Sequence, residues 1–174
     1  MNWIPSFSPA AQGTSPRRAL SALALCSFLF LAGCGEEAVK EPAQDFTLKL
    51  FDGGNFRLSE HLGHPVVINF FASWCIPCKA EAPALDKVYR DNKVNNVAFL
   101  GIAVQDTEIK AMGFVEENGM TFPAGLDEDG KIKEAYGVYG IPVTYFIDRN
   151  GKINYTHAGI LTEDLIRYEL EKIF

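Results

Sequence analysis

The sequence has few histidines, few cysteines and a deficit of basic residues. Three histidines and four cysteines among 174 residues are too few for a miniprotein held together by disulfides. The 16 basic residues are outnumbered by 22 acidic ones, which gives a net charge of −6. A nucleic-acid-binding protein needs a basic face to neutralise phosphates, so the composition argues against one. Repeats and low-complexity tracts are also missing, and 48% of the residues are hydrophobic, which excludes a disordered protein and a collagen.

Acidic residues are missing from the first 35 positions, where Arg17 and Arg18 are the only charged side chains. An apolar run over 19–32 follows them, and as a helix it spans about 21 Å, short of the roughly 30 Å hydrocarbon core of a bilayer. This arrangement predicts an export signal over residues 1–33. An uncleaved membrane anchor that stops at Gly33 is the alternative. Both interpretations place the rest of the chain outside the cytoplasm, facing the periplasm or another extracytoplasmic space.

The export signal ends in Leu31-Ala32-Gly33-Cys34, which resembles the lipobox cut by the lipoprotein signal peptidase of bacteria. The resemblance implies that Cys34 becomes the first mature residue and carries lipid, which attaches the protein to a membrane. Residues 34–44 are polar and acidic, and we expect them to form a lipidated N-terminus and tether. Residues 45–174 are long enough for one domain of ordinary size.

One pair of cysteines, Cys75 and Cys78, remains when the signal and the lipidated Cys34 are set aside. This mature part keeps 14 basic and 22 acidic residues, which gives a net charge of −8. Two residues between the cysteines close so small a loop that a disulfide would restrain the unfolded chain little. The pair therefore predicts chemistry rather than structural support.

The hydrophobic pattern of the domain predicts alternating strands and helices. Pro65–Phe71 is a nearly unbroken apolar run, as expected of a central strand covered on both faces. The other expected elements are strands at 46–50 and 56–58 with a turn at 53–54, a helical turn capped by Ser59, a helix over 75–92, a strand at 97–104, a helix from Asp106 or Thr107 to 118, a helix over 131–136, a strand at 143–147, a hairpin turn at 148–151 into 152–157, and a helix from Thr162. Together they predict an α/β fold with a central mixed sheet flanked by helices.

The segment Trp74-Cys75-Ile76-Pro77-Cys78 stands where the central strand passes into a helix. A cysteine at a helix N-terminus meets unpaired N–H groups and the positive end of the helix dipole, and both favour the thiolate. Cys78 lies in the same helical turn, close enough to form a disulfide with Cys75. Pro77 suits the first turn, where the N–H that it lacks would have no partner. We expect Trp74 to shield one side of this site.

These residues resemble the W-C-x-P-C site of the thioredoxin superfamily, in its exported, membrane-tethered branch of TlpA- and ResA-like thiol-disulfide oxidoreductases. The resemblance covers residues 43–174. It implies a thioredoxin-like fold with an N-terminal β-hairpin and a central strand-helix insert at 105–122. It also implies that Pro142 is a cis-proline facing the cysteines, with Ile141 alongside the substrate chain; an ordinary trans-proline before a strand is the alternative.

The resemblance also implies a mechanism. Cys75 attacks a substrate disulfide, and Cys78 resolves the mixed disulfide, with no cofactor besides the Cys75–Cys78 bridge. The implied partners are exported client proteins with cysteines, apocytochrome c among them as in cytochrome c biogenesis, and a membrane electron donor that recharges the pair. A disulfide-forming oxidase or isomerase is one alternative. A non-enzymatic metallochaperone is another, although His61, His64 and His157 are scattered and we expect no metal site.

Asn69 stands where cytosolic thioredoxins carry a buried aspartate, and an asparagine cannot exchange a proton. Glu81 lies three residues after Cys78, which makes the two side chains neighbours on the helix, and the TlpA/ResA branch also has a glutamate here. We expect Glu81 to tune the pKa of the thiols and to assist Cys78; a solvated carboxylate without a role is the alternative. A peroxiredoxin is disfavoured, because its reactive cysteine needs a threonine three residues earlier, where this chain has Ala72.

Overall fold

The structure is a computed structural model and describes residues 40–174. The predicted signal over 1–33, the predicted lipidation at Cys34 and the tether up to residue 39 lie outside the described residues. Within the described range, the strands are β1 (Thr47–Lys49), β2 (Asn55–Arg57), β3 (Val66–Phe71), β4 (Ala98–Val104), β5 (Ala124–Asp127), β6 (Val143–Ile147) and β7 (Ile153–Ala158). The helices of the same range are α1 (Ile76–Asp91), α2 (Glu108–Glu117), α3 (Lys131–Ala135) and α4 (Glu163–Glu171), with 3-10 turns at Leu58–His61 and Lys93–Asn95.

The sheet is mixed, as predicted. Five strands form it in the order β5-β4-β3-β6-β7, and β1 and β2 form a separate antiparallel hairpin. β4 and β5 extend the sheet in parallel on one side of β3, whereas β6 pairs with β3 antiparallel and β7 pairs with β6 antiparallel. Among residues 40–174, no helix has the length and apolar character needed to cross a membrane.

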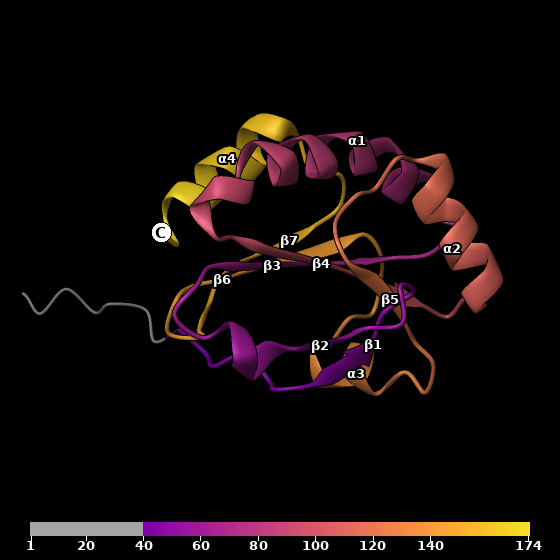
Figure 1. Ribbon diagram of the computed structural model, residues 1–174, viewed down its shortest axis with the longest axis horizontal. Coiled ribbons are helices and arrows are strands. Elements are labelled where there is room, and N and C mark those ends of the chain that lie inside the picture. The colour runs from indigo at the N-terminus through magenta and orange to yellow at the C-terminus, as the bar shows by residue number, and fades with distance from the viewer. Residues whose placement is uncertain (1–39) are drawn as a thin grey trace, which may run out of the picture. The chain divides into compact units, whose positions relative to one another are not determined.

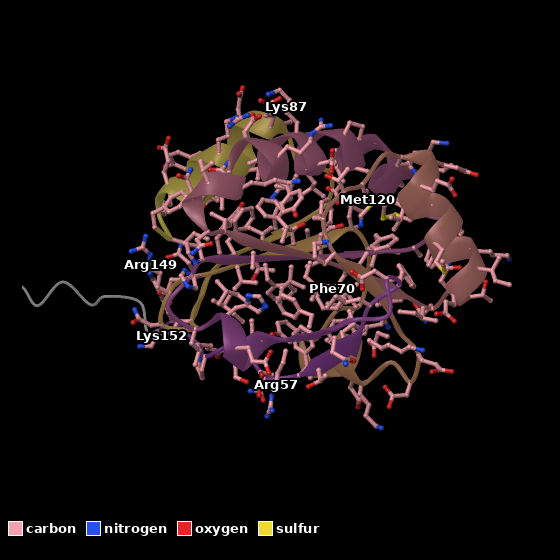
Figure 2. All side chains as sticks on the ribbon, in the orientation of Figure 1. Arg57, Phe70, Lys87, Met120, Arg149 and Lys152 are labelled. Carbon is pink, nitrogen blue, oxygen red and sulfur yellow. A yellow bond between two sulfur atoms is a disulfide. The ribbon has the colours of Figure 1, made fainter. Side chains whose placement is uncertain are left out.

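Three layers build the domain, as Figure 1 shows with the sheet seen edge-on. Helices α1 and α4 lie over one face of the sheet, and the β1–β2 hairpin and α3 lie over the other. Each face has its own apolar core, because successive side chains of a strand point to opposite faces. On β3, Val67 and Phe71 enter the core beneath α1 and α4, whereas Ile68 and Phe70 enter the core on the hairpin side. Phe70 lies between the sheet and the hairpin (Figure 2).

The central position of β3 explains its unbroken apolar sequence. All six residues from Val66 to Phe71 are buried, since helices cover one face and the hairpin covers the other. Asn69 is the one polar side chain of the strand and is itself buried, on the face beneath α1. A polar side chain in that position needs hydrogen-bond partners, and these partners belong to the site described below.

The first described residues pair with the outer edge of the sheet. The N–H of Ala43 donates to the carbonyl of Gly151 at 2.9 Å, and the N–H of Ile153 donates to the carbonyl of Glu41 at 2.8 Å. Pro42 and Lys152 lie opposite each other in this antiparallel bridge. Residues 41–43, which the sequence places in the tether, therefore hydrogen-bond to the domain.

The predicted cap at Ser59 is wrong. Ser59 lies within the 3-10 turn Leu58–His61, whose N-cap residue is Arg57, and no side chain caps this turn. The N–H of Ser59 instead donates to Oδ1 of Asp45 at 2.9 Å, so the carboxylate of a residue 14 positions away holds this turn. Sequence spacing indicates local caps, and it does not indicate a contact supplied by a distant segment such as the one before β1.

The strand of the central insert was also placed wrongly. Residues 105–122 contain α2 and no strand, and the strand β5 follows them. Its four residues contain a glycine and an aspartate, which are uncommon in strands. Gly125 is required, because a Cβ there would lie 2.2 Å from the carbonyl oxygen of Lys49. The close approach of the hairpin holds this strand, and a single segment of sequence does not reveal it.

Candidate redox site

The predicted site residues come together at one end of the sheet. Phe70 of β3 lies opposite Val143, the first residue of β6. Because these strands are antiparallel, Pro142 lies at the end where β3 leaves the sheet and the chain turns into α1. The same end receives Gly159, whose N–H donates to the carbonyl of Pro142 at 2.9 Å. The fold thus places the Pro142 loop and the start of α1, which carries Cys75, at one edge.

The two cysteines form a disulfide at the start of α1. The Cys75–Cys78 bond joins residues whose Cα atoms are 5.3 Å apart. Cys75 is the N-cap residue, and its Sγ accepts a hydrogen bond from the N–H of Cys78 at 3.2 Å. This N–H is one of the donors that the first helical turn leaves without a backbone partner. Pro77 lies in that turn, as predicted. Both cysteines are buried, with 4% and 2% of their surface exposed.

A loop after β4 holds the residues that precede Cys75. The carboxylate of Asp106 accepts hydrogen bonds from the N–H of Ser73 at 2.6 Å and from its hydroxyl at 3.0 Å. The indole N–H of Trp74 donates to the carbonyl of Gln105 at 3.1 Å. The sequence suggested Asp106 only as a helix cap, and the contact with Ser73 across 33 positions was missed. A short polar segment directly after a buried strand was the available signal.

The Ile141–Pro142 peptide bond is cis, as the resemblance implied. Pro142 is buried, and Ile141 is half-buried and packs against the core that contains both cysteines. Four large apolar residues in the loops and the first helical turn at this end of the sheet are exposed to solvent. Their exposed fractions are 58% for Trp74, 82% for Ile76, 98% for Tyr139 and 51% for Ile160. Trp74 and Ile141 were expected at the site from the sequence, whereas Tyr139 and Ile160 were not.

Glu81 is buried one helical turn after Cys78 on α1, so the alternative of a solvated carboxylate is wrong. Only 1% of the residue is exposed. Its Oε1 accepts from Nδ2 of Asn69 at 2.8 Å, and its Oε2 accepts from the N–H of Leu161 at 2.9 Å. Burial raises the pKa of Glu81 to about 7, and the two hydrogen bonds act in the opposite direction by stabilising the charge. A group with this pKa can give or take a proton near neutral pH.

Asn69 connects this carboxylate to the neighbouring strand. Its Nδ2 donates to Glu81 and also to Oγ1 of Thr144 at 2.9 Å, and all three side chains are buried. From its sequence position, Asn69 was expected only to be a residue that cannot exchange a proton, and Thr144 was not expected at the site. The signal in the sequence was a polar side chain within an apolar strand, because such a side chain needs buried hydrogen-bond partners.

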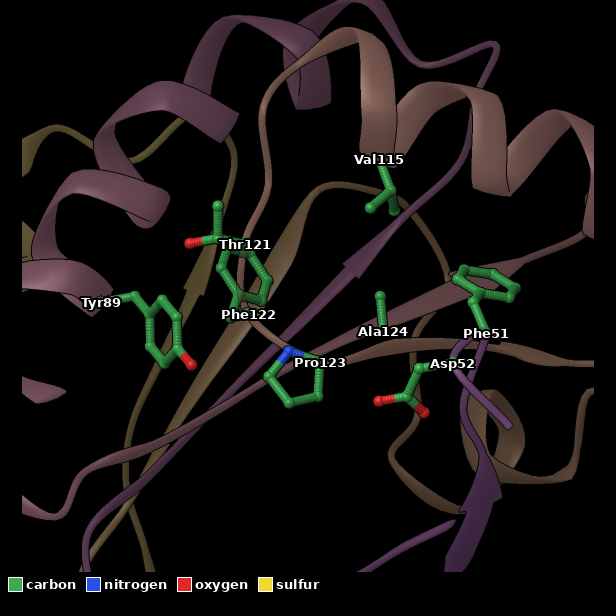
Figure 3. Close-up of a pocket in the computed structure, with 8 residues that line it drawn as sticks. All are labelled: Phe51, Asp52, Tyr89, Val115, Thr121, Phe122, Pro123 and Ala124. Atoms are coloured by element: carbon green, nitrogen blue, oxygen red, sulfur yellow. The ribbon is translucent and has the colours of Figure 1, made fainter. Parts of the chain in front are cut away.

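Residues 40–174 contain no group of three or more His, Cys, Asp or Glu side chains placed to hold a metal ion. A pocket of about 260 Å³ lies away from the cysteines, beside β5 and the end of α1 (Figure 3). None of the predicted site residues lines it. The lining residues are Phe51, Asp52, Tyr89, Val115, Thr121, Phe122, Pro123 and Ala124.

Comparison with known families identifies the domain. The model of the AhpC/TSA family matches residues 39–156, well over half of the chain. The chain belongs to the AhpC/TSA family. Curated relatives carry a more specific name. Thiol-disulfide oxidoreductase ResA of Geobacillus thermodenitrificans is 35% identical over 136 residues, which cover 78% of each chain. ResA of Bacillus subtilis is 33% identical over 134 residues, covering 76% of this chain and 75% of the relative.

Solved structures of similar proteins have the same architecture. MTB DsbF, solved in mixed oxidized and reduced forms, matches with a TM-score of 0.71 and 30% identity over 77% of this chain and 99% of that one. A secreted Mycobacterium tuberculosis disulfide oxidoreductase, described as homologous to E. coli DsbE, matches with a TM-score of 0.64 and 29% identity, covering 73% and 95%. The predicted thioredoxin-like fold is therefore confirmed. With the Cys75–Cys78 disulfide, these relatives make this AhpC/TSA member a thiol-disulfide oxidoreductase.

Proposed function

We propose that this oxidoreductase works as a reductase of disulfides in exported client proteins, with Glu81 as its proton carrier. The observation that carries the proposal is the buried carboxylate of Glu81, which lies one helical turn from Cys78. Its pKa is raised to about 7. A resolving thiol has to lose its proton before it can attack. A neighbouring carboxylate that can accept a proton near neutral pH suits that step.

Cys75 is the nucleophile in this proposal. Its position as N-cap of α1 and the hydrogen bond from the N–H of Cys78 to its sulfur favour the thiolate over the thiol. The thiolate attacks one sulfur of the client disulfide, the S–S bond of the client breaks, and its first cysteine leaves as a thiolate that takes a proton from water. A mixed disulfide between Cys75 and the client remains.

Cys78 completes the reaction. Its thiol gives a proton to the carboxylate of Glu81, and the resulting thiolate attacks the sulfur of Cys75. The mixed disulfide breaks and the second client cysteine leaves as a thiolate, which takes up a proton. Two electrons have then passed to the client, and the Cys75–Cys78 bridge is the oxidised product. No cofactor besides this bridge enters the cycle.

The apolar surface beside the disulfide supports a protein client. Trp74, Pro77 and Ile141 are the predicted contact residues, and Tyr139 and Ile160 are exposed apolar side chains close in sequence to Pro142 and Gly159. The loop that carries Ile141 could pair its backbone with an extended client segment in the manner of an added strand. Because both cysteines are nearly buried, the client disulfide has to be presented by such a fitted segment.

The export signal over 1–33, the lipid on Cys34, the tether over 34–44 and the domain over 45–174 complete the proposal. They would hold the enzyme on the extracytoplasmic side of a membrane, where a membrane electron donor can reduce it again. Apocytochrome c is the client we favour, since haem attachment requires reduced cysteines. The sequence supports these points through its charge distribution and the lipobox resemblance.

The reduction potential of the Cys75–Cys78 pair tests the direction of the reaction. We expect a value near that of thioredoxin, about −270 mV, measured by equilibrium with a thiol buffer. A value near −120 mV, typical of a strong oxidant, would refute the reductase and favour the disulfide-forming alternative. Metal bound to the purified reduced protein would point to the metallochaperone.

The role of Glu81 is tested by the variant Glu81→Gln, which has no exchangeable proton. We expect both thiol titrations to shift and the rate of client reduction near neutral pH to fall. An unchanged titration and an unchanged rate would show that Glu81 carries no proton for Cys78.

A further inference from the structure

A single peptide bond lies between two titratable side chains at the edge of the redox site. The carbonyl oxygen of Ile160 is 3.3 Å from Nε2 of His157. The N–H of the same peptide group belongs to Leu161 and donates to Oε2 of Glu81 at 2.9 Å. Ile160 is half exposed, whereas Leu161 is buried. The peptide thus joins a histidine near the surface to the buried carboxylate.

The partners of His157 determine which ring nitrogen carries a proton. A carbonyl oxygen can only accept, so the contact with Ile160 requires a proton on Nε2. On the other side of the ring, the hydroxyl of Tyr155 lies 3.3 Å from Nδ1 and donates to it when the imidazole is neutral. Tyr155 is held in turn against Phe146, with ring centroids 5.9 Å apart. The ring of His157 is therefore oriented from both sides.

The sheet register brings His157 to the same polar row as the partners of Glu81. Asn69 of β3 lies opposite Thr144 of β6, and Thr144 lies opposite His157 of β7. Directly opposite residues share one face of a sheet, with Cβ atoms about 4.5–5.5 Å apart. Asn69 binds the other oxygen of Glu81. His157 thus flanks the carboxylate twice, through a peptide on one side and through two strands on the other.

We propose that His157 is a positioning residue for Glu81, which holds the Ile160–Leu161 peptide so that its N–H stays on the carboxylate. This inference rests on the proton-carrying role proposed for Glu81. A donor on a carbonyl oxygen polarises its peptide group and strengthens the hydrogen bond that the N–H donates. The stronger bond stabilises the charged carboxylate and opposes the effect of burial. Loss of the donor at His157 therefore raises the proton affinity of Glu81.

Few other ionisable groups face this arrangement in the described part of the chain. Tyr155 is the titratable group that contacts His157 on β7. The first turn of α4 contributes Glu163, which pairs with Lys87 at 3.4 Å and with Arg167 at 2.7 Å. The carboxylate that responds to His157 is therefore Glu81, and it does so through the peptide of Leu161.

The experiment compares the titration of Glu81 in variants of the oxidised full-length protein. The infrared C=O band of the protonated carboxyl is followed with pH and assigned by its loss in Glu81→Gln. The variant His157→Leu removes the donor, and we expect the titration midpoint to rise by about half a pH unit, a roughly threefold change in proton affinity. The variant His157→Gln keeps an N–H donor, so its titration midpoint should lie close to that of the wild type. Thr156→Ala, at the neighbouring exposed position of β7, is the matched control and should titrate as the wild type does.

An unchanged midpoint in a folded His157→Leu protein would overturn the proposal, and so would an equal shift in the Thr156→Ala control. If His157→Leu does not fold, Tyr155→Phe gives the same test. It removes the hydroxyl that orients the imidazole and keeps the ring, so a smaller shift in the same direction is expected, and no shift would overturn the proposal. The carboxyl band reports on the link to His157 whether or not Glu81 serves Cys78. If Glu81→Gln leaves the thiol titrations unchanged, that result would refute only the proton-carrying role proposed for Glu81.

Discussion

The buried carboxylate of Glu81 should make the stability of the oxidised protein depend on pH. The pKa of Glu81 is about 7 in the folded protein against an ordinary value of 4.5. Between these two values the folded protein keeps a proton that the unfolded chain has already released. The free energy of unfolding therefore falls as pH rises from about 4.5 to 7, and the full loss is present above pH 7.

The size of this loss follows from the difference between the two pKa values. At about 1.4 kcal/mol per pH unit, the free energy of unfolding should fall by about 3 kcal/mol across the window. The variant Glu81→Gln is neutral at every pH, and its amide offers one donor group and one acceptor oxygen, much as the protonated carboxyl does. We expect its stability to lack this fall.

Urea unfolding of both proteins between pH 4 and pH 8 measures the effect. The other ionisable side chains are common to both proteins, so their contributions cancel in the difference. The disulfide keeps Cys75 and Cys78 from titrating. Parallel stability curves for the wild type and Glu81→Gln would refute the reasoning, because they would mean that the carboxyl has the same proton affinity in the folded and unfolded chains.

Two further predictions concern the frame of the site. Asp106→Ala should lower the free energy of unfolding by about 1–2 kcal/mol in urea titrations, because the N–H and hydroxyl of Ser73 lose a charged acceptor; an unchanged midpoint would show that this contact does not stabilise the fold. Gly125→Ala should destabilise the protein by about 1–3 kcal/mol or more, since its Cβ meets the carbonyl of Lys49 at 2.2 Å. The matched substitution Gly113→Ala, in helix α2 with nothing within 4 Å of the added Cβ, should stabilise by about 0.5–1 kcal/mol, and equal melting temperatures for the two variants would contradict the packing argument.

The sequence predicted those parts of the fold that depend on local patterns. The apolar run at Pro65–Phe71 predicted the central strand, observed over Val66–Phe71, because burial on both faces removes any need for alternation. Thr162 was correctly placed at the start of α4, where its side chain accepts from the N–H of Leu165 at 3.3 Å. The strand β5 was missed because neighbouring segments, rather than its own residues, determine its conformation.

The sequence likewise predicted the parts of the candidate site that depend on local spacing and missed those that depend on distant contacts. Helical spacing alone placed Glu81 beside Cys78. Its burial, however, depends on Asn69 and on the N–H of Leu161, which lie 12 and 80 positions away in the sequence. His157 was dismissed as one of three scattered histidines, because its partner is a backbone carbonyl and a carbonyl leaves no mark in a sequence. Contacts of this kind become visible only when the register of β6 and β7 is known.

In the proposed anchored enzyme, the bridge between residues 41–43 and 151–153 would limit the distance between the lipid and the domain. The bridge lies where β6 ends and β7 begins, whereas Pro142 precedes the opposite end of β6. Six residues lie between Cys34 and Glu41, and the seven Cα-to-Cα steps that join the two span about 25 Å at most. In the proposed anchored enzyme, the attachment point of the domain would therefore lie at the opposite end of β6 from the Pro142 loop. A client or an electron donor of that enzyme would have to approach the disulfide at the end of the sheet away from this attachment point.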